Sequence, residues 1–141
     1  MKRILIPVDG STHAVHAVRA LLQARRYDPV ERVELLSVQI PLQAGKIGRG
    51  LSQTDIDAYH HEEGAAALRE ASALLAADGV SYGERVEIGA IADTIVRVAG
   101  EIDADEIYMG TRGLGSVASL FMGSVATRVL RLASLPVTLV K

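Results

Sequence analysis

The chain has 141 residues and a mass of 15.0 kDa, which is the size of one ordinary domain. Hydrophobic residues make up 49% and charged residues 23%, so a disordered chain is excluded, and no apolar run reaches the roughly 18–20 residues that span a bilayer. The net charge is −2, and the absence of cysteine excludes disulfides, thiolate zinc sites and a cysteine nucleophile. We therefore expect a single domain over residues 1–141, located in the cytoplasm and without a membrane partner.

Hydrophobic periodicity predicts that strands and helices alternate along the chain. The continuous apolar run from Ile4 to Val8 is typical of a strand buried on both faces, and five predicted strands with interleaved helices imply a parallel sheet joined by right-handed crossovers. The fold class is therefore α/β, with helices on both faces of the sheet. In chain order, the predicted elements are a strand at 4–8, a helix with the apolar stripe Ala14 to Leu22, a strand at 33–40, a mobile loop at 41–53, a helix at 54–78, a strand at 82–88, a helix at 92–101, a strand at 106–109, a helix at 124–133 and a strand at 136–140.

Two of the predicted helices contain features that bear on packing. Gly64 is a weak point inside the alanine-rich helix at 54–78, which Gly79 closes. The helix at 124–133 is the last predicted helix of the chain. The residues that it is expected to bury are Val125, Ala126, Val129, Leu130 and Ala133.

The last quarter of the chain differs in charge from the rest. Residues 1–106 contain all 17 acidic residues, and residues 107–141 contain none. An acid-free and glycine-rich segment favours a site for an anion, although a short segment can also lack acids by chance. We expect no nucleic-acid partner, because basic residues are few and aromatic residues are scarce. The basic residues of the segment are Arg112, Arg128, Arg131 and Lys141.

Glycines in this segment indicate where an anion would bind. Gly110 and Gly113 follow a predicted strand, where backbone N–H groups can approach a ligand closely. Gly123 and Ser124 open the last predicted helix, whose first amides and macrodipole attract anions. A Walker sequence is absent, and the Rossmann pattern fails because no acidic residue follows Glu106.

The spacing Gly110-x2-Gly113-x9-Gly123-Ser124 resembles the G-2x-G-9x-G-[S/T] signature of the ATP-binding members of the universal stress protein family. The resemblance covers the whole chain, including the turn Pro7-Val8-Asp9-Gly10-Ser11 and the closing strand after Leu135. It implies a three-layer α/β fold of the adenine nucleotide alpha hydrolase-like kind, with an open parallel five-stranded sheet of order 3-2-1-4-5. That order brings the turns after the first and fourth strands together at the switch point, where open α/β sheets bind ligands.

The same resemblance implies roles for individual residues. Asp9 would approach the phosphates through a bridging divalent cation, for which Mg²⁺ is the natural candidate, and Thr127 is a further candidate for a phosphate contact. Members of the family often carry His-Val at the end of the second strand, whereas this chain has Ser37-Val38. The implied contacts are an adenine slot of Pro7, Val8, Val38 and Met109, a ribose and phosphate wrap of Gly110, Arg112 and Gly113, and a phosphate cradle of Gly123, Ser124 and Val125.

Several of these residues also have structural interpretations. Asp9 could cap the first helix, and the glycines could be turn residues in a member that has lost nucleotide binding. His13 and His16 have no third ligand nearby and are expected on the solvated surface. Arg128 and Arg131 are also expected there, with contact to a phosphate or to a partner as the alternative. His60 and His61 are adjacent, so a helix points them about 100° apart and shared chelation of a metal is not expected.

We expect a nucleotide-dependent regulatory protein, in which ATP occupancy changes the loop at 41–53 and a surface that faces an unidentified protein partner. The alternatives are a nucleotide-free interaction module and a slow ATPase. An evolved enzyme is not indicated, because a strand-elbow nucleophile, paired carboxylates and a lysine near the glycines are all missing from the sequence. The apolar strand Pro136–Val140 would lie at a sheet edge, so we also expect a homodimer through this strand, as the resemblance implies.

Overall fold

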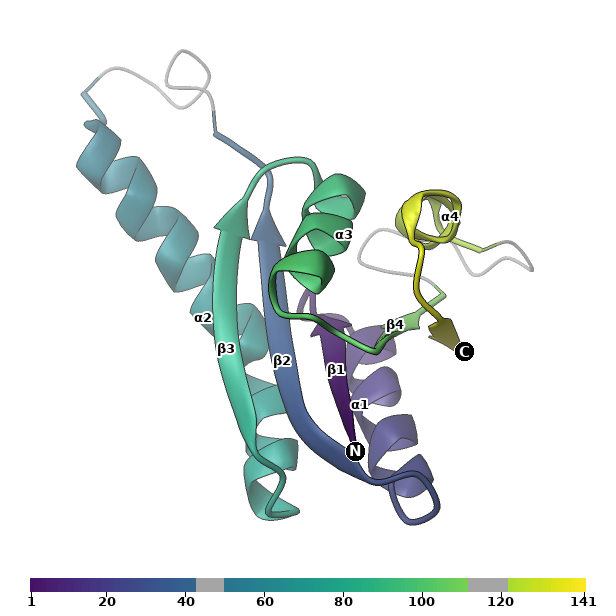
Figure 1. The fold of residues 1–141 in the computed structure, drawn as a ribbon. Helices are drawn as coiled ribbons and strands as arrows, with labels where there is room; N and C mark the ends of the chain where they lie inside the picture. The colour runs from purple at the N-terminus through teal and green to yellow at the C-terminus, as the bar shows by residue number, and fades with distance from the viewer. Residues whose placement is uncertain (43–49, 112–121) are drawn as a thin grey trace.

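The protein is described by a computed structural model that covers residues 1–42, 50–111 and 122–141. Within these residues, five strands alternate with four helices and form one parallel sheet of order β3-β2-β1-β4-β5 (Figure 1). The predicted fold class and strand order are confirmed. The elements are β1 (Lys2–Pro7), α1 (Thr12–Ala24), β2 (Val30–Gln39), α2 (Gln53–Ala77), β3 (Tyr82–Ile88), α3 (Ile91–Glu101), β4 (Glu106–Gly110), α4 (Ser124–Leu132) and β5 (Val137–Val140).

The sheet has a separate hydrophobic core on each face. Ile4 and Ile6 of β1 pack with α1 and α2, whereas Leu5 between them packs with α3 and α4. Side chains alternate between the two faces of a strand, so both sets are buried and β1 is apolar from Ile4 to Pro7. Figure 1 shows the resulting three layers, with α1 and α2 behind the sheet and α3 in front of it.

The long helix α2 is continuous through the predicted weak point at Gly64. Ser52 caps the helix and forms a capping box with Asp55, because each side chain bonds the backbone N–H of the other residue. Gly64 itself is buried, and a Cβ atom at this position would lie 2.6 Å from both γ carbons of Val86 on β3. The glycine therefore lets α2 approach the sheet closely. Of the predicted loop at 41–53, residues 43–49 lie outside the described residues.

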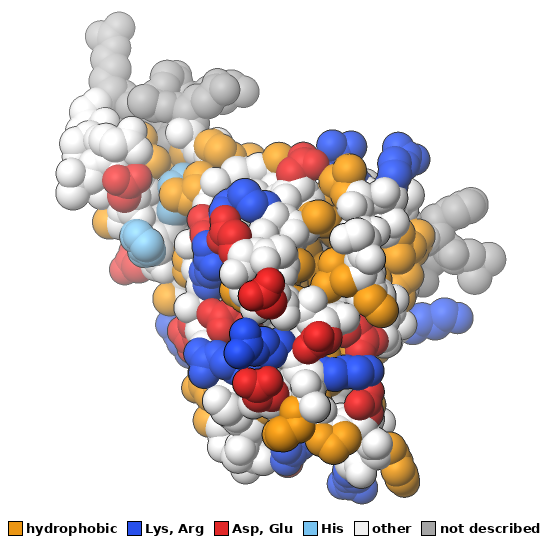
Figure 2. Space-filling model, viewed as in Figure 1, with side chains coloured by type: hydrophobic (Ala, Val, Ile, Leu, Met, Phe, Trp, Pro, Cys, Tyr) orange, Lys and Arg blue, Asp and Glu red, His pale blue; other side chains and the backbone are white. Residues whose placement is uncertain are grey.

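The expected burial of α4 is only partly correct. Ala126 and Val129 are buried, but Leu130 is 41% exposed, so its predicted place in the core is wrong. α4 packs against α3, and Leu130, one turn after buried Ala126, lies at the edge of the buried stripe, where the described residues leave it partly uncovered. Hydrophobic side chains gather over this region of the surface at the right of Figure 2. No helix among the described residues is long and apolar enough to cross a membrane.

Candidate functional site

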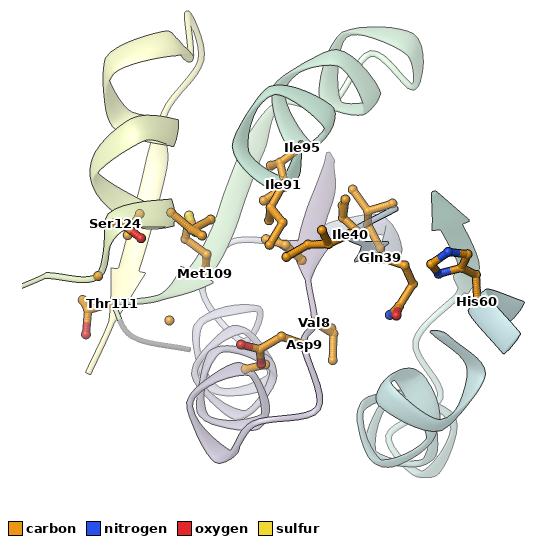
Figure 3. Close-up of a pocket in the computed structure, with 18 of the residues that line it drawn as sticks. Val8, Asp9, Gln39, Ile40, His60, Ile91, Ile95, Met109, Thr111 and Ser124 are labelled. Atoms are coloured by element: carbon orange, nitrogen blue, oxygen red, sulfur yellow. The ribbon is translucent and has the colours of Figure 1, made fainter. Parts of the chain in front are cut away.

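A cavity of about 460 Å³ opens where β1 and β4 end at the carboxyl edge of the sheet (Figure 3). β1 and β4 are neighbours, and the helices α1 and α4 that follow them pack on opposite faces of the sheet, so a crevice forms at the ends of the two strands. Arg112 and Gly113 lie outside the described residues. All the other residues of the predicted nucleotide site line this cavity, namely Pro7, Val8, Asp9, Val38, Met109, Gly110, Gly123, Ser124 and Val125.

The turn after β1 fixes the position of Asp9. The Asp9 Oδ1 atom accepts a hydrogen bond from the Ser11 backbone N–H at 2.9 Å, and Gly10 supplies the positive φ of +83° that the turn needs. The N-cap of α1 is Ser11, whose hydroxyl accepts from the Ala14 N–H. The interpretation of Asp9 as the helix cap is therefore wrong. Its carboxylate points toward the Thr111 and Ser124 side of the cavity (Figure 3).

The opposite wall contains the N-terminus of α4. The Gly123 N–H donates to the Thr111 carbonyl at 2.6 Å, so this amide is already engaged within the protein. Ser124 and Val125 begin the helix, and helix geometry leaves their N–H groups without an intrahelical acceptor. Both residues line the cavity, where these amides and the helix dipole favour a negative charge.

Thr127 does not belong to this lining. Its hydroxyl donates to the Gly123 carbonyl at 2.9 Å, which is the ordinary bond of a helical threonine to the residue one turn before. The expectation that Thr127 reaches a phosphate therefore finds no support in the position of its side chain.

Gly110 has a packing role that is independent of any ligand. A Cβ atom at Gly110 would lie 3.0 Å from the carbonyl oxygen of His13 on α1, and 3.0 Å from the His13 Cβ. The end of β4 therefore approaches the α1 backbone more closely than a side chain allows. The close approach of Gly110 to His13 determines where the end of β4 lies, and this end lines the cavity.

Apolar side chains line the middle of the cavity. Val8 and Met109 come from the ends of β1 and β4, and Val38 comes from β2. Ile91 and Ile95 of α3 close the slot from above in Figure 3. An apolar slot of this kind suits a flat aromatic ring better than it suits a charged group.

His60 lines the far end of the cavity, and no motif in the sequence assigned it to the nucleotide site. The side chain is only 2% exposed, whereas neighbouring His61 is exposed. The signal for this burial was a stripe at four-residue spacing, in which Ile56, His60, Gly64 and Leu68 all lie on the buried side of α2. The stripe is inconspicuous because two of its members are a histidine and a glycine.

The remaining candidate residues either have partners within the protein or lack the further ligands that a metal site needs. The rings of His13 and His16 stack edge to face at 6.3 Å, and the described residues contain no group of three or more His, Cys, Asp or Glu that could hold a metal ion. Arg128 pairs with Asp93 of α3 at 3.1 Å. Ser37, which stands where the family often has histidine, is buried and accepts a bond from the Gln39 amide nitrogen.

The strand order and the cavity define an open, doubly wound α/β protein with its site at the switch point of the sheet. The chain belongs to the universal stress protein family, whose profile matches residues 1–141.

Two curated relatives align with almost the entire chain. A universal stress protein of Methanocaldococcus jannaschii, MJ0531, is 31% identical over 140 residues, which cover 99% of this chain and 82% of the relative. A universal stress protein of Thermus aquaticus, encoded 3′ of a QAH/OAS sulfhydrylase gene, is 33% identical over 141 residues and covers 99% and 98% of the two chains.

Solved structures share the fold. Protein MJ0577 superposes with a TM-score of 0.84 at 24% identity, covering 99% of this chain and 95% of its own. A universal stress protein in complex with cAMP has a TM-score of 0.71 at 26% identity, with coverage of 99% and 97%. The universal stress protein of Archaeoglobus fulgidus in complex with dAMP has a TM-score of 0.68 at 25% identity, with coverage of 100% and 98%.

Proposed function

We propose that this protein is a cytoplasmic regulatory module that binds ATP in the cavity at the ends of β1 and β4. The observation that carries the proposal is the layout of this cavity. An apolar slot leads directly to a helix N-terminus whose first amides have no intrahelical acceptor. A nucleotide has the matching order of groups, with an apolar base at one end and phosphates at the other. Adenine nucleotides bound to two related structures support the choice of base.

The end of β2 offers a means of recognising adenine. The Leu36 carbonyl accepts from the Val8 N–H, whereas the Gln39 carbonyl accepts from Gly89 on the β3 side. Backbone groups alternate in direction along a strand, so the N–H and C=O of Val38 face the β1 side, just past the point where β1 ends. The Val38 N–H can donate to N1 of adenine, and the Val38 C=O can accept from the adenine amino group.

Asp9 would act on the phosphates through Mg²⁺. A carboxylate beside phosphates is repulsive unless a cation lies between them, and Mg²⁺ commonly takes one or two protein carboxylates together with phosphate oxygens. The described residues around the cavity fit this arrangement, because they supply a single carboxylate opposite the α4 N-terminus. The ion would then depend on the nucleotide for most of its ligands.

The regulatory role rests on what the described lining contains. Asp9 is the only side chain in that lining with a formal charge, whereas fast phosphoryl transfer needs a positioned base and an additional cation. We therefore propose that occupancy, and not turnover, is the output. The difference in affinity between ATP and ADP would determine how far exchange of the nucleotide shifts the equilibrium between two conformations of the protein. We also propose that the protein forms a homodimer through the strand Pro136–Val140. A further protein partner, not yet identified, would respond to the bound nucleotide.

Denaturing the purified protein and identifying released small molecules by mass spectrometry tests the ligand directly. Calorimetric titration with ATP, ADP, AMP and cAMP then ranks the nucleotides. We expect ATP to bind at millimolar or lower concentration. Absence of any released nucleotide and of ATP binding at millimolar concentration would favour a nucleotide-free interaction module, whereas rapid release of phosphate would favour an ATPase.

The role of Asp9 is tested by comparing ATP affinity with and without Mg²⁺. Asp9→Asn keeps the oxygen that accepts from the Ser11 N–H and removes the charge, so the turn is retained. We expect Mg²⁺ to strengthen ATP binding in the parent protein and to have little effect in this variant. Asp57→Asn on the exposed side of α2 is the matched control and should respond to Mg²⁺ as the parent does.

A further inference from the structure

His60 is a buried polar residue whose hydrogen bonding is incomplete. Its Nε2 atom accepts from the Leu42 backbone N–H at 3.4 Å, while its Nδ1 atom has no hydrogen-bond partner among the described residues. The ring is 2% exposed, and it extends from α2 into the end of the cavity beside Gln39 and Ile40 (Figure 3). An unpaired polar atom in such a place is costly unless a bound molecule pairs with it.

The bond from Leu42 determines what His60 can offer. A nitrogen that accepts a hydrogen bond carries no proton, so in the neutral ring the proton lies on Nδ1. His60 therefore carries an N–H donor on Nδ1, an atom with almost no accessible surface, so a ligand group that pairs with it must be an acceptor and must be admitted by a small movement of the ring. A ring nitrogen of a heterocycle meets this requirement.

We propose that His60 is a specificity-determining residue that donates from Nδ1 to N7 of a bound purine. The inference rests on the proposed function, since it takes the phosphates to lie at α4 and the base to lie toward β2. Three ring nitrogens of adenine can accept from His60. N1 is complementary to the Val38 backbone, and N3 lies beside the ribose. N7 remains on an open edge of the ring.

The location of His60 supports a role in reading the base. Ser124 and His60 line opposite ends of the same cavity, and the apolar side chains of Val8 and Met109 lie between them (Figure 3). Phosphates at the first end would place the base near the second. The nearby Gln39 amide nitrogen is committed to Ser37 at 2.9 Å, so it does not duplicate the His60 donor.

Two substitutions of His60 test the roles of its two ring nitrogens one at a time. His60→Gln retains a side-chain oxygen that can accept from the Leu42 N–H, but it has no donor at the Nδ1 position. His60→Asn places an amide N–H near the Nδ1 position and lacks the acceptor for Leu42. His61→Gln is the matched control, because it makes the same change one residue away on the exposed side of α2.

Calorimetric titrations with ATP and with its 1-deaza, 3-deaza and 7-deaza analogues test the assignment, because each analogue replaces one ring nitrogen by C–H. We expect the parent protein and His61→Gln to bind 7-deaza-ATP about five- to ten-fold more weakly than ATP. His60→Gln should bind ATP and 7-deaza-ATP equally, both at the weaker affinity. His60→Asn should recover part of the preference for ATP.

The outcomes distinguish this inference from the proposed function. If the parent protein binds ATP and 7-deaza-ATP equally, or if His60→Gln retains the full preference, the role of His60 is overturned while nucleotide binding stands. If only 1-deaza-ATP or 3-deaza-ATP loses affinity through His60, the assignment to N7 is overturned. If the parent protein binds no adenine nucleotide, the proposed function fails and the inference fails with it.

Discussion

Gly64 of α2 lies directly against the side chain of Val86 on β3, at a distance that leaves no space for a methyl group. A Cβ atom would meet both γ carbons of Val86 at 2.6 Å, and a β-branched side chain has little rotamer freedom with which to move away. The closest approach of α2 to the sheet therefore depends on this glycine.

We expect Gly64→Ala to lower the free energy of unfolding by about 1–2 kcal/mol, because overpacking outweighs the higher helix propensity of alanine. Gly100→Ala in α3 is the control, since nothing lies within 4 Å of a Cβ atom there. It should raise stability by about 0.5–1 kcal/mol. Urea unfolding of both variants checks the prediction, and two changes of the same sign would contradict it.

Gly110→Ala should destabilise the protein by about 1–3 kcal/mol and also weaken ATP binding, because the end of β4 would be forced away from α1. The nearest atoms include the His13 carbonyl group, which belongs to the backbone. We therefore expect that adding His13→Ala does not restore stability. Thermal unfolding and calorimetry measure the two effects, and full rescue by the second substitution would show that the backbone contact is unimportant.

Ser124→Ala tests the helix N-terminus as a phosphate site. Loss of one hydroxyl bond to a charged phosphate oxygen should weaken ATP binding by roughly 1–2 kcal/mol, with little change in stability. Ser134→Ala, at an exposed position that does not line the cavity, should leave the affinity unchanged. Equal affinities for the two variants would place the phosphates elsewhere.

The outer edge of β5 should carry the dimer contact. The carbonyl of Pro136 accepts from the Ile107 N–H of β4, and that of Val140 accepts from the Thr111 N–H just after β4. Alternation therefore directs the N–H and C=O of Val137 and Leu139 away from the sheet. An unguarded edge of this kind pairs readily with a second copy. We expect a dimer by sedimentation for the parent protein, and weakened association for Leu139→Asp.

Tyr27→Asp serves as the control for this experiment, because Tyr27 is exposed and lies at the end of α1 away from β5. It should remain dimeric. Circular dichroism is needed for Leu139→Asp, since Leu139 also packs against the core on the α3 and α4 side. A monomeric parent protein, or a folded Leu139→Asp variant that is still fully dimeric, would contradict the β5 interface.

Two surface carboxylates should make stability depend on acid pH. Bonds from the backbone and side chain of Ser52 lower the pKa of Asp55, and bonds from Arg97 and Arg85 lower the pKa of Glu101. Glu101 forms ion pairs with both arginines, and Figure 2 shows basic and acidic side chains interspersed over the visible surface. A lowered folded-state pKa means that the stabilisation is complete above the unfolded-state pKa, near 3.8 for Asp55 and 4.5 for Glu101, and is lost as the pH falls through the folded value.

We therefore expect Asp55→Asn and Glu101→Gln to be less stable than the parent protein at pH 7. The difference should shrink as the pH falls below about 4.5 and should vanish once the parent carboxylates are protonated. Melting temperatures between pH 7 and pH 3 measure this convergence. A difference that stays constant over the whole range would exclude the ionised carboxylates as its cause.

The fold was predictable because its signals are local. Apolar runs, the turn at Asp9-Gly10-Ser11 and the glycine at the end of α2 mark the elements within a few residues of their observed bounds. The grouping of the site residues was also predictable, since strand order determines which turns meet. The described members of the predicted site do line one cavity.

The features that were missed depend on contacts between distant segments. Nothing near Leu130 in the sequence shows that this residue of the apolar stripe stays partly uncovered, and nothing near Gly110 reveals that a Cβ atom there would lie 3.0 Å from the His13 carbonyl oxygen. His60 was considered only as a metal ligand shared with His61, because a histidine inside an alanine-rich helix carries no clear signal of burial. Its burial becomes evident only when the cavity and the end of β2 are seen together.

The bond from the Gly123 N–H to the Thr111 carbonyl has a consequence for how this family can diversify. It joins Thr111, just after β4, to Gly123, at the N-terminus of α4, so a backbone bond of 2.6 Å links the two walls of the cavity. Both partners are backbone groups, so the bond does not depend on the side chain at position 111. Relatives can therefore vary that side chain, which lines the cavity, while the spacing between the end of β4 and the helix N-terminus is kept.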